Sequence, residues 1–115
     1  MTYFYKSFVY ALRGLKTVWN EERNFRIEIL IAIFVALFAY FNRFSLIETT
    51  LLVVAIVMVI AGEIVNTTVE DLCNKIEPSH DLAIGKIKDM MAGFVLVNSI
   101  GASLVGLLVF LNHFF

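Results

Sequence analysis

Long apolar runs alternate with short polar segments along this chain. An apolar run from Ile27 to Phe41 is interrupted only by Glu28, and a run from Leu51 to Gly62 carries no charge. A third run extends from about Met90 to Leu111. Because a membrane-spanning helix needs about 20 mostly apolar residues, the pattern predicts three transmembrane helices, at about 25–44, 46–70 and 90–111.

The first segment, 3–19, has a different pattern, with apolar residues on one side of a helix and basic residues on the other. A helix with two such faces lies in the membrane surface. The apolar face holds Phe4, Phe8, Ala11, Leu12, Leu15, Val18 and Trp19, and the basic residues are Lys6, Arg13 and Lys16. We therefore expect an all-α membrane protein, a single domain over 1–115 with an amphipathic N-terminal surface helix before the three spans.

Polar segments between the apolar runs predict the connections. The segment 20–28 is dense in charge and is expected to form an elbow before the first span, and 42–44 is expected to be a turn. Ser45, followed three residues later by Glu48, matches the capping box that starts many helices. The segment 75–89 is expected to be a polar connection before the third span.

Composition agrees with a membrane protein. The chain is 60% hydrophobic and 17% charged, with a mean hydropathy of +0.85, whereas soluble domains average about 45–50% apolar and about 25% charged residues. The net charge of −1 does not indicate nucleic-acid binding. Cys73 is the only cysteine, which excludes an intrachain disulfide, and is expected to serve packing. His113, close to the end of the chain, is expected to be idle.

Basic residues predict the orientation. If the amino terminus and the 75–89 connection share one side of the membrane, eight basic residues lie there and only Arg43 lies on the other side. The side richer in lysine and arginine is normally cytoplasmic. We expect a multi-pass protein of the plasma (inner) membrane with a cytoplasmic amino terminus. The eight residues are Lys6, Arg13, Lys16, Arg23, Arg26, Lys75, Lys86 and Lys88.

A polar stripe interrupts the apolar pattern at the end of the second span. At about 100° per residue, Glu63, Glu70 and Asn74 share one helical face, flanked by Asn66 and Thr67. A rise of about 1.5 Å per residue separates the two carboxylates by about 10 Å along the axis. The stripe is expected to lie at the cytoplasmic interface, with Glu63 at headgroup depth. Ionisable groups at such places are costly and usually functional.

The polar residues at this interface are suited to phosphoryl transfer. Carboxylate and amide oxygens suit magnesium, lysines suit phosphate, and a carboxylate at headgroup depth can take a proton from a lipid hydroxyl. No Walker loop and no protein-kinase signature occurs in the sequence. From the residues alone, an enzyme, a small proton-coupled transporter and a non-catalytic membrane subunit remain open. The gathered residues are Glu21, Glu22, Glu28, Glu63, Asn66, Glu70, His80, Asp81, Lys88 and Asp89.

The octapeptide from Glu63 to Glu70, Glu-Ile-Val-Asn-Thr-Thr-Val-Glu, resembles a known motif. In the prokaryotic diacylglycerol kinase and undecaprenol kinase family that motif is E-hydrophobic-hydrophobic-N-T/S-A-hydrophobic-E. Three further blocks, 7–14, 22–28 and 88–93, resemble the family's surface helix, first elbow and start of the third span. The resemblance covers nearly the whole chain.

The resemblance implies ATP- and Mg²⁺-dependent phosphorylation of a membrane lipid alcohol, undecaprenol or diacylglycerol. It also implies a homotrimer with active sites shared between subunits. By position, Glu63 is similar to the catalytic base, Glu63 and Ala92 to substrate-binding residues, and Glu22 and Glu70 to the metal ligands. The positions similar to ATP-binding residues are Tyr10, Glu22, Asn66, Glu70, His80, Asp81, Lys88 and Asp89.

Four positions depart from the family pattern. Asn74 stands where the family commonly has Asp, and Thr68 stands where Ala is usual. His80 falls one residue earlier than the family's loop histidine, and Tyr3 occupies a position where some members have Arg. The elbow 22–24, Glu-Arg-Asn, looks more like the undecaprenol kinase branch.

Overall fold

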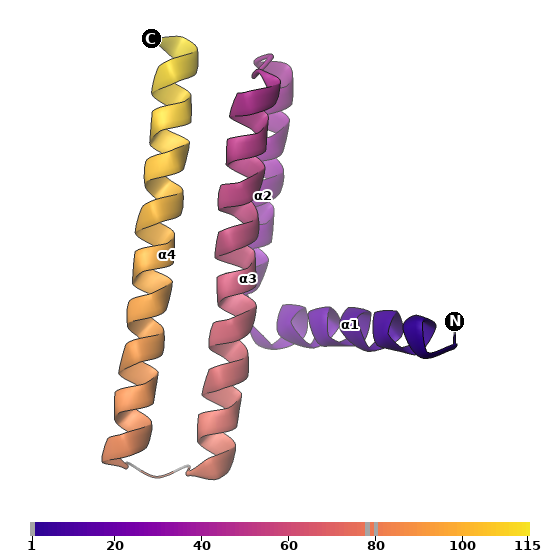
Figure 1. Ribbon diagram of the computed structural model, residues 1–115, viewed down its shortest axis with the longest axis vertical. Coiled ribbons are helices and arrows are strands. Elements are labelled where there is room, and N and C mark those ends of the chain that lie inside the picture. The colour runs from indigo at the N-terminus through magenta and orange to yellow at the C-terminus, as the bar shows by residue number, and fades with distance from the viewer. Residues whose placement is uncertain (1, 78, 80) are drawn as a thin grey trace.

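A computed structural model describes residues 2–77, 79 and 81–115, and these residues form four α-helices (Figure 1). The three apolar helices that follow the first one meet the length and composition needed to cross a membrane. The predicted fold class, an all-α protein with a surface helix and three spanning helices, is confirmed. The helices are α1 (Thr2–Glu21), α2 (Arg23–Phe41), α3 (Leu46–Ile76) and α4 (Leu82–Phe114).

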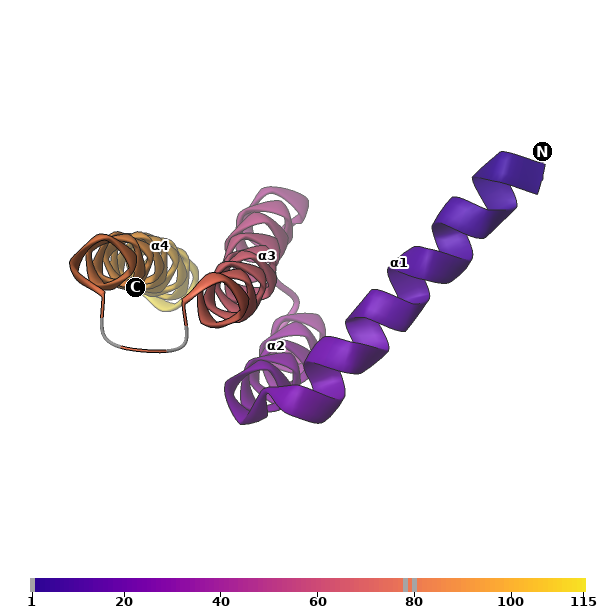
Figure 2. The same cartoon turned by 90° about the horizontal axis from the view of Figure 1, so that it is seen from below.

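Helix α3 lies between α2 and α4, and its most extensive packing is against α4 (Figures 1 and 2). The three run side by side along the long axis of the molecule, whereas α1 lies crosswise and packs mainly on α2. Of the α1 residues, only Val18 is buried. This exposure agrees with the amphipathic surface helix predicted for 3–19.

The elbow between α1 and α2 is a single residue, Glu22, in an extended conformation with φ −114° and ψ 110°. The Arg26 guanidinium crosses it and donates to the carbonyl oxygens of Trp19 at 2.6 Å and Asn20 at 3.3 Å. The elbow predicted over 20–28 is shorter in the structure, because arginine and glutamate favour helix and Arg26 satisfies carbonyls left free at the end of α1.

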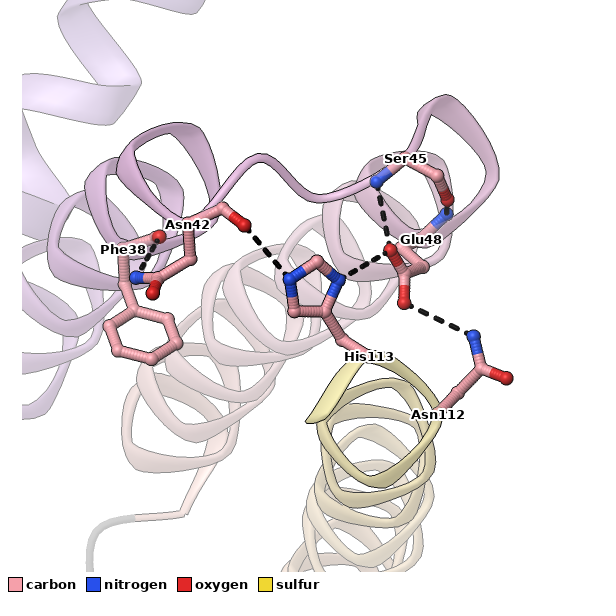
Figure 3. Close-up of polar contacts among 6 residues, drawn as sticks. All are labelled: Phe38, Asn42, Ser45, Glu48, Asn112 and His113. Atoms are coloured by element: carbon pink, nitrogen blue, oxygen red, sulfur yellow. Dashed lines mark hydrogen bonds and ion pairs between the residues drawn. The ribbon is translucent and has the colours of Figure 1, made fainter. Parts of the chain in front are cut away.

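The turn predicted at 42–44 joins α2 to α3, and the predicted capping box follows it (Figure 3). The backbone N–H of Glu48 donates to the Ser45 hydroxyl at 3.1 Å, and the Ser45 N–H donates to the Glu48 carboxylate at 2.8 Å. Arg43 adopts a left-handed conformation with φ 58°, which turns the chain. The first span was predicted to reach residue 44, but α2 ends at Phe41.

The sequence suggested that His113 is idle, and this was wrong. His113 connects three elements at this end of the bundle (Figure 3). One ring nitrogen lies 3.0 Å from the Glu48 carboxylate and the other lies 2.8 Å from the Asn42 carbonyl oxygen. The ring also stacks on Phe44 at 4.1 Å between centroids. Asn112 donates to the second Glu48 oxygen at 3.1 Å. These contacts fasten the end of α4 to the α2–α3 turn.

At the other end of the bundle, α3 and α4 form a long hairpin that extends past the level of α1 (Figure 1). The predicted spans 46–70 and 90–111 lie inside longer helices, so the connection is 77–81 and not 75–89. Asp81 starts α4 because its carboxylate accepts from the Ile84 N–H at 3.1 Å. In the loop, the Ser79 hydroxyl and N–H donate to Glu77 and lower the pKa of that carboxyl.

Helices α3 and α4 approach closely at Gly62. The Asn98 side-chain amide donates to the Met58 carbonyl oxygen at 2.7 Å, and a Cβ at Gly62 would lie 2.5 Å from the same amide nitrogen. Small residues allow this kind of close approach between membrane helices. Cys73 is buried at 4% exposure, which confirms its expected packing role. The contact at Gly62 fixes α4 beside the turn of α3 that carries the polar stripe.

Candidate active site

A cleft of about 410 Å³ opens between α3 and α4 in the hairpin half of the bundle, bordered by the start of α2. The polar stripe of α3 forms one wall, since positions 63, 66 and 70 lie on one helical face. Lys88 and Ala92, which the sequence analysis also named as site residues, form part of the α4 wall. The lining residues are Asn24, Glu63, Asn66, Val69, Glu70, Lys88, Met91, Ala92 and Val95.

Glu63 is the buried carboxylate of this cleft, with 6% of its surface exposed. The negative charges of Glu22 and Glu70 repel the charge of the Glu63 carboxylate, and the charge of Glu63 in turn repels that of Glu28. Across residues 2–77, 79 and 81–115, the one ion pair joins His113 to Glu48, so no described cation pairs with Glu63. A buried carboxylate surrounded by like charges is costly for folding, which points to a chemical role.

Glu22 lies at the elbow between α1 and α2 and is not among the residues that line the cleft. It occupies the position before the first residue of α2, yet its side chain makes no capping hydrogen bond. Its carboxylate is therefore not used by the helix that it precedes. The two predicted metal ligands, Glu22 and Glu70, act electrostatically on Glu63 from the elbow and from α3 within a single chain.

Lys88 contributes the only cation among the residues that line the cleft. Its ammonium group donates to the side-chain oxygen of Asn74 at 2.7 Å. Asn74 lies one helical turn beyond Glu70, at the position where the family commonly has Asp. The hydrogen bond ties α4 to α3 at the water-facing end of the cleft.

The donor set fits magnesium with a nucleotide. In the described part of the chain, no three His, Cys, Asp or Glu side chains lie close enough to hold a metal ion by themselves. Magnesium in kinase sites uses one or two carboxylates together with substrate phosphates, which Glu22 and Glu70 can supply. Glu28 and Thr67 each carry a buried oxygen with no hydrogen-bond partner among the described residues. These two oxygens therefore remain able to bind a ligand or a metal-bound water near Glu63.

Three other predicted nucleotide-binding positions, Tyr10, Asp81 and Asp89, do not line this cleft in the single chain. Tyr10 is 60% exposed on α1, where Arg13 lies 5.4 Å above its ring. Asp81 and Asp89 line a separate hollow of about 480 Å³ along α4. His80 lies outside the described residues. Whether these positions meet nucleotide stays a prediction.

The prediction missed Asn24, Val69, Met91 and Val95 as lining residues. Asn24 could have been singled out, because it is an uncharged polar residue beside Glu22 at the start of an apolar helix. The three apolar residues carry no such signal. Their inclusion depends on the pairing of α3 with α4, which spacing within one helix does not reveal.

Comparison with known proteins identifies the class. The model of the prokaryotic diacylglycerol kinase family matches residues 9–110. The chain is 32% identical to the undecaprenol kinase of Bacillus subtilis (strain 168), over 94% of this chain and 88% of the relative. It is 28% identical to the diacylglycerol kinase of Haemophilus influenzae, over 84% and 82%. It is 27% identical to the diacylglycerol kinase of Escherichia coli (strain K12), over 91% and 86%.

One cleft of this helical membrane protein holds a buried carboxylate, a second carboxylate and a lysine. Together with the family match and the curated relatives, this cleft identifies the protein as a lipid kinase. The chain belongs to the prokaryotic diacylglycerol kinase family. The family and the enzyme class predicted from the sequence are confirmed. The transporter and the non-catalytic subunit are therefore disfavoured.

Proposed function

We propose that this protein uses ATP and Mg²⁺ to phosphorylate the hydroxyl group of a membrane lipid alcohol. The observation that carries the proposal is the burial of Glu63 in a cleft that also holds Asn66, Glu70 and Lys88. In the reaction, the lipid oxygen bonds to the terminal phosphorus of ATP, ADP leaves, and the hydroxyl proton is removed. Bound magnesium would supply positive charge to the transferring phosphoryl group.

Five polar residues have a proposed task. Glu63 orients the lipid hydroxyl and accepts its proton, as a positioned general base does. Glu22 and Glu70 hold the metal, Lys88 offsets phosphate charge, and Asn66 orients the nucleotide. This division follows the depth of the groups, because Glu63 is buried whereas Glu70 and Lys88 are exposed.

Undecaprenol and diacylglycerol are the proposed acceptors. Undecaprenol is favoured by the 32% identity to the Bacillus subtilis undecaprenol kinase, against 28% and 27% for the two diacylglycerol kinases. The test measures transfer of labelled phosphate from ATP in detergent micelles that contain one lipid alcohol at a time. Transfer to undecaprenol well above transfer to diacylglycerol is expected. No transfer to either lipid, with the helical fold verified by circular dichroism, would contradict the proposal.

The proposed location is the plasma membrane, with the cleft facing the cytoplasm. Eight basic residues on the elbow and hairpin side against Arg43 on the other support this orientation. The cytoplasmic side is also where ATP is available. The variant Glu77→Cys, made in a Cys73→Ala background, has one cysteine in the connection between α3 and α4. If this connection is cytoplasmic, the cysteine should react with an impermeant maleimide only after cells are opened.

A further inference from the structure

The tasks proposed for the cleft residues do not explain one contact at the edge of the cleft. Lys88 of α4 donates to the side-chain oxygen of Asn74 on α3 at 2.7 Å, although the two residues are 14 positions apart in the chain. Both residues are exposed. A lysine side chain at a surface loses rotamer freedom when it is held in one place, so a fixed Lys88 suggests that its position matters.

Glu70 is the competing partner for Lys88. It lines the same cleft and precedes Asn74 by four residues, which places the two side chains on one face of α3, about 6 Å apart along the axis. A lysine freed from Asn74 can reach such a carboxylate through its flexible stem. A Lys88–Glu70 pair would engage both the cation proposed for phosphate and a carboxylate proposed for metal.

We propose that Asn74 is a positioning residue that holds Lys88 toward the nucleotide phosphates and away from Glu70. An amide oxygen suits this task because it accepts a hydrogen bond from the ammonium group. The inference rests on the proposed function and adds to it the residue that keeps the lysine and the metal carboxylate apart.

The test compares Asn74→Leu with Asn74→Asp by direct binding of Mg-ATP in detergent micelles. Asn74→Leu removes the acceptor and should weaken binding about tenfold, the scale for one hydrogen bond to a charged group. Asn74→Asp keeps an acceptor at the same place and should stay within about threefold of the wild type, since exposed ion pairs offset little charge. Asp71→Leu, an exposed polar-to-apolar change on the same helix, is the matched control.

A double-mutant cycle separates positioning from general structure. In a Lys88→Met background, Asn74→Leu should cause no further loss of Mg-ATP affinity, because the residue that it positions is gone. The KM for the lipid alcohol and the thermal midpoint should not change in Asn74→Leu. Equal losses in both backgrounds, or wild-type affinity in Asn74→Leu, would overturn the proposal. Absence of Mg-ATP binding by the wild type would instead overturn the proposed function on which it rests.

Discussion

Glu63 is the buried ionisable residue among the described residues that line the cleft. It is 6% exposed, lies in the field of Glu22 and Glu70, and has no cationic partner among the described residues. Evolution could remove the cost of burying this charge with a single change to glutamine. A hydroxyl that must lose its proton at the membrane surface gives a physical reason to keep the carboxylate, because glutamine is nearly the same size but cannot accept that proton.

Replacing Glu63 with glutamine should therefore abolish turnover and spare nucleotide binding. We expect the kcat of Glu63→Gln to fall at least about 100-fold, the usual scale for loss of a general base. Mg-ATP affinity should stay close to the wild-type value, because the buried residue is not a proposed metal ligand. Steady-state phosphate transfer and direct Mg-ATP binding measure the two quantities. Near-normal turnover would remove Glu63 from the chemistry.

Glu22 and Glu70 should behave in the opposite way. Glu22→Ala and Glu70→Ala each remove an anionic ligand from a cation that also holds phosphate, so Mg-ATP affinity should fall and raised magnesium should restore part of it. The neighbouring changes Glu21→Ala and Asp71→Ala remove the same charge at positions outside the proposed site and serve as controls. Unchanged affinity in both test variants would place the metal elsewhere.

The predictability of the site depended on how far apart in sequence its members are. Positions 63, 66 and 70 could be grouped because helical periodicity relates residues within one helix. Lys88 could be grouped with them only as a polar residue at the same interface, and Ala92 only through the family resemblance, since their approach depends on the packing of α4 against α3. The Lys88–Asn74 bond required coordinates, because nothing in local spacing encodes it.

At the scale of elements, the ends of the helices were harder to predict than their existence. Hydrophobicity marks the part of a helix that crosses the membrane, whereas hydrogen bonding decides where the helix stops. Helices α3 and α4 therefore continue past the apolar runs to Ile76 and back to Leu82. At about 1.5 Å per residue, a helix of 31 residues is about 47 Å long. It exceeds a hydrocarbon core of about 30 Å and carries Glu70 and Asn74 into water.

The His113 contacts give the opposite end of the bundle a measurable role. The ring nitrogens lie within hydrogen-bond distance of the Glu48 carboxylate and the Asn42 carbonyl oxygen. His113→Ala should lower the free energy of unfolding by about 2 kcal/mol through loss of two hydrogen bonds and of stacking. His113→Phe keeps stacking and should lose less. Thermal unfolding in detergent measures both, and kcat of the folded protein should not change.

A wild-type thermal midpoint in His113→Ala would show that these contacts do not stabilise the bundle. Asn112→Ala is a useful comparison, because it removes one hydrogen bond to the same carboxylate and leaves the ring in place. Its effect should be smaller than that of His113→Ala.

At the scale of the whole molecule, one chain leaves much of its apolar surface uncovered. The buried hydrophobic residues are few compared with the exposed ones on α2, α3 and α4. The cleft is also open on one side, bordered by only three helices. Water reaching the transferring phosphoryl group would compete with the lipid hydroxyl. A second chain packed on the open side would exclude it, and the family resemblance implies a homotrimer with shared sites.

Mixing two impaired variants tests whether sites are shared between subunits. Glu22→Ala chains and Glu63→Gln chains should each have little activity alone at limiting Mg-ATP. If Glu22 of one chain completes the site of its neighbour, some mixed trimers will contain a site with all wild-type groups. Activity should then reappear when the two preparations are mixed under conditions of subunit exchange, and its amount should depend on the mixing ratio.

The alternative arrangement gives a different result from the same mixture. Within one chain, Glu22 already lies near enough for its charge to act on Glu63, so a site made by a single chain is a real competitor. In that case every site keeps one lesion and the mixture gains no activity. Cross-linking of differently tagged chains verifies exchange in both cases. Exchange without recovered activity would exclude sharing of Glu22 between subunits and leave the lipid kinase assignment unchanged.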